Sequence, residues 1–197
     1  MVSQTLTEIF GEAPAPGELE FVREFVNTRE LDPDREDIGD AQALGTWLDD
    51  HGIPVAGSLA EPDVQQAQSF REAIRDLLLA NNGEELPGAS LEELRTAASS
   101  APLQIEVSGD GSLATAPAAS GVDALIARTL SVAAAAQERG EWQRLKACRS
   151  HDCVWAFYDR SRNRSRHWCS MGVCGNRAKT RAYRAKRASR GTPAETE

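Results

Sequence analysis

Four cysteines form two close pairs in the last third of a 197-residue sequence. Four residues separate Cys148 from Cys153 and Cys169 from Cys174, and fifteen residues lie between the two pairs. This spacing is typical of sites in which four thiolates surround one Zn²⁺ tetrahedrally. The sequence therefore predicts one structural zinc ion bound by Cys148, Cys153, Cys169 and Cys174.

Two disulfides, or four buried thiols, are the alternatives to a zinc site. The first twenty residues show no basic segment followed by an apolar run, so no secretory signal is visible. We therefore expect a cytoplasmic protein, and in that reducing compartment paired cysteines are more often metal ligands. Few large apolar residues surround the cysteines, so burial alone would hardly fold this segment. His151 and His167 lie close by and are interpreted as neighbours or phosphate contacts.

Basic residues are concentrated around the cysteines. Residues 141–197 contain 14 Lys and Arg against 5 Asp and Glu, whereas residues 1–140 contain 8 against 25. The formal charges are thus +9 and −17, which agree with the −8 of the whole chain. An acidic N-terminal part therefore carries a strongly basic C-terminal part.

Arginine pairs with phosphate oxygens bidentately and releases condensed counterions, so we expect nucleic acid, double-stranded DNA in particular, as the partner. Asn176 and Arg177 would lie in a first helical turn, where Asn can read adenine and Arg guanine. Contact by about six to eight cations would give a log K against log[salt] slope of roughly −5 to −7. The predicted contacts are Arg160, Arg162, Arg164, Arg166, Asn176, Arg177, Lys179, Arg181, Arg184 and Lys186.

A hairpin and a helix must hold these residues. Residues 154–159 alternate in side-chain direction and predict a strand, the polar residues 161–165 a turn, and residues 165–169 a return strand. Residues 176–190 are rich in Ala and Arg without Gly or Pro, and predict a helix. We expect Ala178, Ala182 and Ala185 to face the hairpin and the metal. Knuckle, hairpin and helix would form a treble-clef-like zinc module.

The run Cys174, Gly175, Asn176 and Arg177, with FYDRSRNRSRHW before it and the basic helix after it, resembles the CGNR zinc-finger family. FVNT at Phe25 to Thr28 and the helix around FREAIRDLL are similar to the N-terminal domain of that family. The resemblance implies a C-terminal finger behind an α-helical, ABATE-like domain. Such proteins are regarded as bacterial stress-related transcription regulators.

The acidic part reads as mainly helical. Asp40 is an expected N-cap, and Ser90 with Glu93 has the order of a capping box. Residues 31–39 read as a solvated acidic loop. Helices are expected at 19–30, 40–52, 61–82, 90–101 and 121–140, and a β-hairpin at 103–116.

The predicted fold class is α+β: a mainly α-helical N-terminal domain with a short β-hairpin, followed by the four-cysteine module. We expect an acidic regulatory or sensor domain at 1–140, a CGNR-type zinc finger at 141–190 and a disordered tail at 191–197. Trp142 and Leu145 would dock the finger on the helical domain.

Three functional readings remain open. A full set of four cysteine ligands closes a zinc site to substrate, and no catalytic motif occurs, so we expect no enzymatic activity. The finger binds DNA in the first reading, and in the second it is a protein-contact or structural module docked on its own acidic domain, or across a homodimer. In a third, the N-terminal domain also senses a small molecule through Asn27, Thr28 and Arg29. We expect no membrane association, because no apolar run is long enough to span a membrane.

Overall fold

The computed structural model of the chain describes residues 14–190, apart from the side chains of residues 185, 186 and 188–190. The α-helices are α2 (Leu19–Val26), α3 (Ala41–Asp50), α4 (Glu61–Asn81), α5 (Gly88–Ser100), α6 (Gly121–Glu138) and α7 (Asn176–Arg190). Antiparallel strand pairs are β1 (Arg29–Leu31) with β2 (Asp34–Glu36), β3 (Leu103–Val107) with β4 (Leu113–Pro117), and β5 (Leu145–Ala147) with β6 (Ala156–Tyr158). The expected α+β class is confirmed, while the predicted tail at 191–197 lies outside the described residues.

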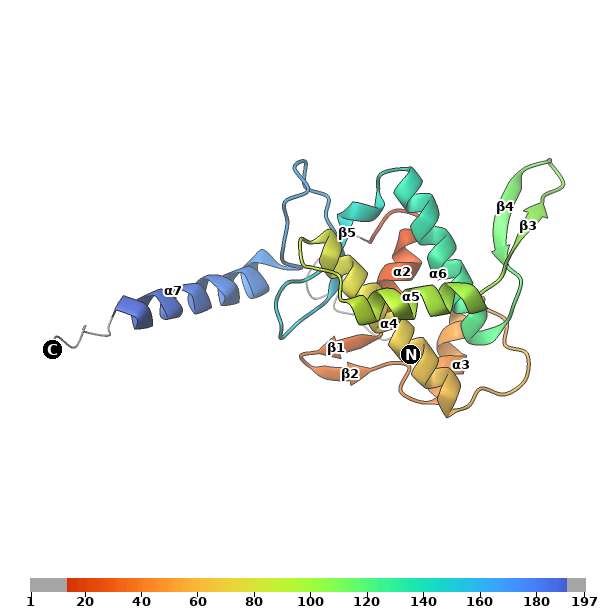
Figure 1. Cartoon of the computed structure of the whole chain (residues 1–197), viewed down its shortest axis with the longest axis horizontal. Helices are drawn as coiled ribbons and strands as arrows, with labels where there is room; N and C mark the ends of the chain where they lie inside the picture. The colour runs from red at the N-terminus through yellow and green to blue at the C-terminus, as the bar shows by residue number, and fades with distance from the viewer. Residues whose placement is uncertain (1–13, 191–197) are drawn as a thin grey trace.

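The elements form a helical body with two projections (Figure 1). We call α2 to α6 with the strands β1 to β4 the helical body, and residues 141–190 the finger. At one end α7 extends away from the body, and at the opposite end the β3–β4 hairpin stands out from it. Among residues 14–190, no helix combines the length and apolarity that crossing a membrane requires.

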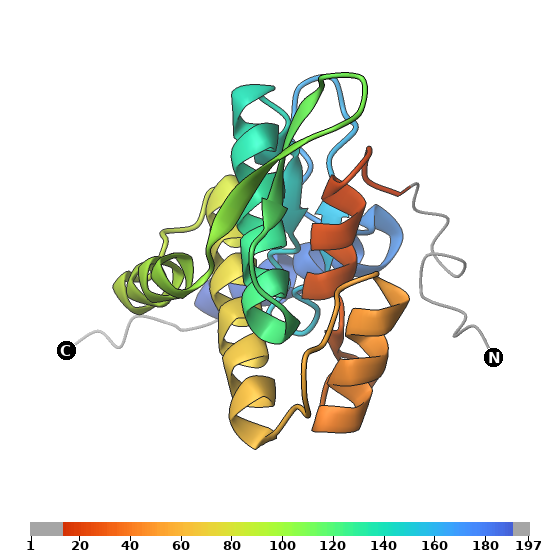
Figure 2. The ribbon, with the colours of Figure 1, turned by 90° about the vertical axis from the view of Figure 1, so that its right-hand side faces the viewer.

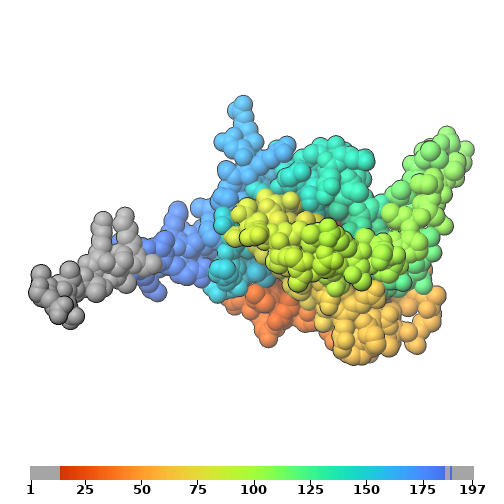
Figure 3. Space-filling model, viewed as in Figure 1, coloured from red at the N-terminus to blue at the C-terminus, as the bar shows by residue number. Residues whose placement is uncertain are grey.

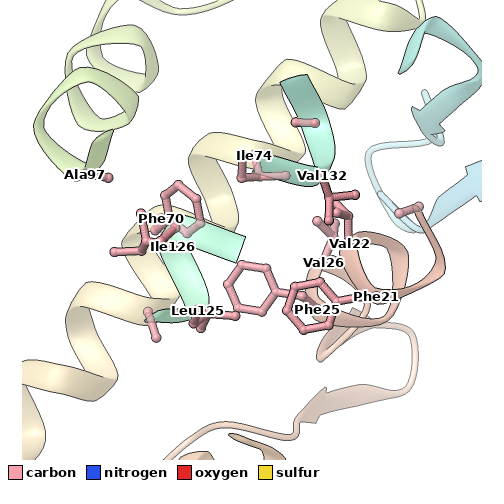
Figure 4. Packing of buried hydrophobic residues seen from close by; sticks show 14 of the residues in the cluster. Phe21, Val22, Phe25, Val26, Phe70, Ile74, Ala97, Leu125, Ile126 and Val132 are labelled. Atoms are coloured by element: carbon pink, nitrogen blue, oxygen red, sulfur yellow. The ribbon is translucent and has the colours of Figure 1, made fainter. Parts of the chain in front are cut away.

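The core lies between α2, α4 and α6, which run beside one another (Figure 2). Phe25 of α2 stacks on Phe70 of α4 with ring centroids 6.0 Å apart, and Leu125 of α6 is buried beside them (Figure 4). These apolar residues recur at helical spacing, so each helix has one buried face. The predicted helices are confirmed, including Asp40 as an N-cap whose carboxylate accepts from Ala43 N at 2.8 Å.

Two parts of the body differ from expectation. The first helix ends at Val26, and the predicted acidic loop forms the β1–β2 hairpin, because Glu30 lies opposite Arg35 and Arg29 pairs with Asp34 across the strands. The predicted capping box is wrong as well. Helix α5 starts at Gly88, and the Ser90 hydroxyl donates to Asp76 of α4.

The start of the finger is part of the same core. Trp142 is 2% exposed and Leu145 is fully buried, both within the cluster formed by the body helices. The predicted docking through these two residues is confirmed. As a result, the β5–β6 sheet lies against α4 and next to α2.

Three asparagine side chains close the outer edges of the β5–β6 sheet. On the β6 edge, the Asn27 amide accepts from Ala156 N at 2.8 Å and donates to Ala156 O at 3.0 Å. On the β5 edge, Asn81 donates to Leu145 O at 2.9 Å and Asn82 donates to Ala147 O at 2.8 Å. Each amide thus takes the place of a neighbouring strand, and satisfies backbone groups that burial would otherwise leave without partners.

Replacing Asn27 with Ala should destabilise the protein, because both backbone groups of Ala156 lose their partner in a buried position. We expect the free energy of unfolding to fall by about 2–4 kcal/mol, measured by chemical denaturation. Asn163→Ala, in an exposed loop, is the matched control and should change it by less than about 0.5 kcal/mol. Equal effects of both changes would contradict the role given to Asn27.

Candidate metal centre and basic surface

The four cysteine sulfurs meet at one point in the finger. All four Sγ atoms lie within 4.8 Å of one another, with Cys153 3.4 Å from Cys169 and Cys169 3.7 Å from Cys174. Tetrahedral zinc with bonds of about 2.3 Å separates its sulfurs by about 3.8 Å. Disulfide sulfurs would lie about 2.05 Å apart, and all four cysteines are free. The cluster therefore fits a zinc ion and excludes the disulfide alternative in this structure.

Crowding of the thiols shifts their ionisation in opposite directions. Hydrogen bonds from the Cys153 and Cys169 thiols hold the pKa of Cys148 far below its usual value. The same bonds raise the pKa of Cys153 and Cys169, and burial raises the pKa of Cys174. One thiolate thus opposes ionisation of its neighbours, and a divalent cation would supply the charge that lets all four ionise.

The first cysteine pair sits on a knuckle between β5 and β6. The strand ladder continues past β5, since Cys148 N donates to Trp155 O at 2.9 Å. The knuckle then turns tightly, with Cys153 N and Val154 N donating to Ser150 O at 2.9 and 3.1 Å. Val154 has a φ of +49°, an uncommon conformation for a β-branched residue. Arg75 of α4 stabilises it by donating to Val154 O at 2.9 Å.

The second pair is positioned by the turn that leads into α7. Ser170 accepts from Val173 N through its side chain at 3.4 Å and from Gly175 N through its carbonyl at 3.0 Å. These bonds form a π-helical turn, Met171–Gly175, that places Cys174 just before α7. Asn82, the residue after α4, donates to His167 O and accepts from its Nδ1 through the amide oxygen, so the body also holds the chain leading to Cys169.

The hairpin predicted between the two pairs is wrong. Its first strand exists as β6, but β6 pairs with β5, which comes before the first cysteine pair in the sequence. Residues 159–170, all within the described range, form no strand. The reason is Asp159, a fully buried carboxylate. It accepts from Lys146 Nζ at 2.8 Å, Ser161 Oγ at 2.6 Å and Arg166 N at 3.0 Å. These bonds replace a strand ladder.

The environment of Asp159 keeps it charged. Burial works to raise the pKa of Asp159, but hydrogen bonds from Lys146, Ser161 and Arg166 outweigh it and lower that pKa to about 2. Lys146 Nζ also donates to the carbonyls of Arg164 and Arg166, at 2.6 and 3.2 Å. The buried ion pair thus fixes the backbone of residues 159–166, which we call the arginine loop.

Helix α7 does not pack as expected. Ala178 is half-buried, but Ala182 is exposed, and the Ala185 side chain lies outside the described residues. Beyond its first turns α7 extends away from the cysteines, so Ala182 does not face the metal site (Figure 1). The basic side chains of α7 that the structure describes, those of Arg177, Lys179, Arg181, Arg184 and Arg187, are exposed for the same reason.

Some predicted contact residues are engaged within the chain. Arg160 donates to Pro14 O at 2.5 Å, and Asn176 donates to Gly172 O at 3.0 Å. The Arg166 guanidinium donates to Trp168 O at 3.0 Å and lies 5.0 Å from the Phe157 ring centroid. Arg166 therefore supports the chain that leads to Cys169.

Two arginines of α7 pair with carboxylates. Both terminal nitrogens of Arg177 lie 3.3 Å from Asp32 Oδ2, in the β1–β2 turn of the body. Arg181 lies 2.5 Å from Asp152 of the knuckle and also donates to Ser150 Oγ at 3.1 Å. Arg177 thus connects the finger to the helical body.

The remaining predicted contacts point to solvent. Arg162, Arg164, Lys179 and Arg184 are exposed and form no ion pair with any residue in the described range. Arg187, outside the predicted set, is exposed in the same way. The Lys186 side chain lies outside the described residues.

The three residues predicted to bind an effector have different surroundings. Asn27 and Thr28 are buried, Asn27 at the β6 edge and Thr28 with its hydroxyl donating to Phe25 O and accepting from Arg71 at 3.0 Å. Burial works to lower the pKa of Arg71, but bonds to Glu36 outweigh it and raise that pKa. Only Arg29 lines a cleft, a surface hollow of about 780 Å³ between α4 and α5.

Sequence reasoning missed the residues that hold the finger to the body. Asn81 and Asn82 are the last two residues of the helix predicted at 61–82, and the amides of both bind β5. Arg75 was given no role, and it joins α4 to the knuckle. Polar residues at the end of a predicted helix are the one feature of the sequence that could have indicated these contacts between the body and the finger.

Comparison with family models gives two matches. The ABATE model, described as "Putative stress-induced transcription regulator", matches residues 20–141, and a model described as "CGNR zinc finger" matches residues 144–187. The second range contains all four cysteines, and neither description names an enzymatic activity. A search of curated proteins finds no match. The predicted resemblance is confirmed, and with the cysteine geometry it identifies a zinc-binding module.

Replacing Cys169 with Ser should abolish zinc binding, because three thiolates remain and a weaker ligand replaces the fourth. We expect about one zinc per chain in the parent protein and little in the variant, measured by elemental analysis. Hydrogen exchange should become faster across residues 148–176 while α4 and α6 stay protected. Ser165→Ala is the control and should keep its zinc; zinc retained by the cysteine variant would refute the ligand assignment.

Proposed function

Because the chain belongs to the ABATE family and carries a CGNR zinc finger, we propose that it is a transcription regulator that binds double-stranded DNA through this finger. The zinc ion has a structural role in this proposal. It holds the knuckle and the start of α7 together, and the finger then presents its cations to the phosphates.

The exposed cations of the finger carry this proposal. Arg162 and Arg164 on the arginine loop, and Lys179, Arg184 and Arg187 on α7, form no ion pair with any residue between 14 and 190. A basic helix that only neutralised the acidic body would lie along it. Instead α7 extends into solvent (Figure 3), which favours an external polyanion over an intramolecular role.

A concave surface at the start of α7 supports phosphate binding. Asn176, Arg177, Arg181 and Arg184 line a hollow of about 470 Å³. The planar guanidinium groups around this hollow can each form two parallel hydrogen bonds to the oxygens of a phosphate. Asn176 and Arg177 at its rim are the proposed readers of base edges.

The arginine loop gives a second group of cations at the same end of the molecule as α7 (Figure 1). The buried pair of Lys146 and Asp159 fixes the backbone of this loop from the interior of the protein. The exposed side chains of Arg162 and Arg164 therefore extend from a backbone of defined conformation. Such preorganisation reduces the entropy lost when a loop binds.

The N-terminal domain has the regulatory role in this proposal. Its cleft, lined by Arg29 between α4 and α5, would receive a small effector. Arg75 lines the same cleft and donates to Val154 O in the knuckle. A ligand that displaced Arg75 would act directly on the backbone beside Cys153.

DNA affinity should fall steeply with salt. Five unpaired cations that contact phosphate give a log K against log[salt] slope of about −4.5, and Arg184→Ala should reduce its magnitude by about 1. Binding of the zinc-loaded chain to random-sequence duplex DNA, followed by fluorescence anisotropy, measures both. Arg95→Ala is the control, because Arg95 is an exposed arginine on α5 of the body.

No binding of the zinc-loaded chain at low salt would refute the DNA proposal and favour a protein-contact module. Equal losses from the Arg184 and Arg95 variants would refute α7 as the binding surface, because the attraction would then depend on overall charge alone.

Removing the Asp32 carboxylate should strengthen DNA binding, because Asp32 occupies Arg177 in the free protein. We expect Asp32→Asn to raise the affinity by about twofold to fivefold, the worth of an exposed ion pair. Asp34→Asn is a matched control in the same hairpin, since Asp34 pairs with Arg29 instead. Equal increases in both variants would point to a general charge effect and contradict a specific contact.

A further inference from the structure

The β3–β4 hairpin exposes an apolar surface at the end of the molecule opposite to α7 (Figure 1). Ile105 is 65% exposed, Val107 70% and Leu113 71%. Val107 lies opposite Leu113 across the hairpin, so these side chains share one face. All five residues of β3 are exposed, whereas β4 lies towards α6. Contiguous exposed apolar residues of this kind mark interaction sites.

The outer edge of β3 offers unpaired backbone groups. Ser108 N donates to Ser112 O, and Ala118 N donates to Pro102 O, each at 2.9 Å, so even-numbered residues of β3 bond to β4. Because these groups alternate along a strand, Leu103, Ile105 and Val107 direct their N–H and C=O groups outwards. No residue between 14 and 190 pairs with this edge.

We propose that β3 pairs antiparallel with β3 of a second copy of this chain, around a two-fold axis at Ile105. The two hairpins then form one continuous four-stranded sheet, and the protein is a homodimer. The outward groups of Leu103, Ile105 and Val107 meet the same groups of the second copy, because an axis at Ile105 pairs odd residues with odd residues.

The side chains select this register. With the axis at Ile105, all five residues of β3 overlap, Leu103 faces Val107 of the other copy, and Gln104 faces Glu106. An axis at Glu106 would place two carboxylates opposite each other, which is destabilising. An axis at Gln104 would move Val107 beyond the end of the other β3, opposite Ala101, which is buried in the body. The sequence Leu-Gln-Ile-Glu-Val is therefore complementary to itself in one arrangement.

In this dimer both fingers stay accessible to DNA, but the dimer does not depend on DNA binding. The hairpin and α7 lie at opposite ends of the body, so pairing through β3 leaves both basic surfaces open (Figure 3). Each copy has a formal charge of −8, so salt screens their repulsion and favours the dimer. Salt weakens DNA binding instead, and the two associations can be separated on this basis.

Light scattering of the zinc-loaded chain over a concentration series tests the proposal. We expect a monomer–dimer equilibrium that shifts to dimer as salt increases, and loss of the dimer in Ile105→Glu, where two carboxylates would meet on the axis. Leu113→Glu makes the same change on β4 of the same hairpin and should leave the dimer intact. A monomer at every concentration, or equal loss in both variants, would overturn edge pairing.

Cross-linking tests the register. Ile105→Cys places two thiols opposite each other across the axis, within reach of a disulfide, and should give a covalent dimer upon mild oxidation. Gln104→Cys, one residue away, should not, because it faces Glu106. Covalent dimers from both variants, or from neither, would overturn the axis at Ile105. Mass spectrometry of the linked peptide distinguishes the new cysteine from the zinc ligands.

Discussion

The β5–β6 sheet consists of two three-residue strands, and so small a sheet is at best marginally stable in water by itself. Asn27, Asn81 and Asn82 make it possible, because their amides pair with backbone groups on both outer edges. The knuckle with Cys148 and Cys153 is the loop between these two strands. The metal centre therefore depends on three uncharged side chains of the helical body as well as on the four cysteines of the finger.

Charged residues of the finger differ in burial as well as in their position along the sequence. The buried pair of Lys146 and Asp159 fixes the arginine loop from inside, and the buried guanidinium of Arg75 holds the knuckle carbonyl. Breaking such a pair leaves one uncompensated charge in the interior, so these contacts specify one geometry. Near the body and the knuckle the arginines of α7 have carboxylates beside them, as Arg177 has Asp32 and Arg181 has Asp152. Further along α7 the positive charge is exposed.

The sequence was sufficient wherever one local rule applied. Periodic apolar residues predicted α2 to α6, the pattern of residues 103–116 predicted the β3–β4 hairpin, and the cysteine spacing predicted that the four thiols lie together. It was insufficient where a distant side chain replaced a local pattern. Asp159 binds the backbone that we expected to form a return strand, and β6 pairs with a strand that precedes the knuckle. Asn27 looked like part of an effector site because its partner, Ala156, is 129 residues away in sequence.

Helix α7 contains no acidic residue, and its seven cations repel one another within a single helix. Its described side chains bury little apolar surface, so its stability comes from the helix propensity of Ala and Arg and from its attachment at Cys174. A polyanion that neutralises these charges would stabilise the helical form as it binds. Ordering of the helix and recognition are then one coupled equilibrium, with an entropic cost of ordering and a small heat-capacity change.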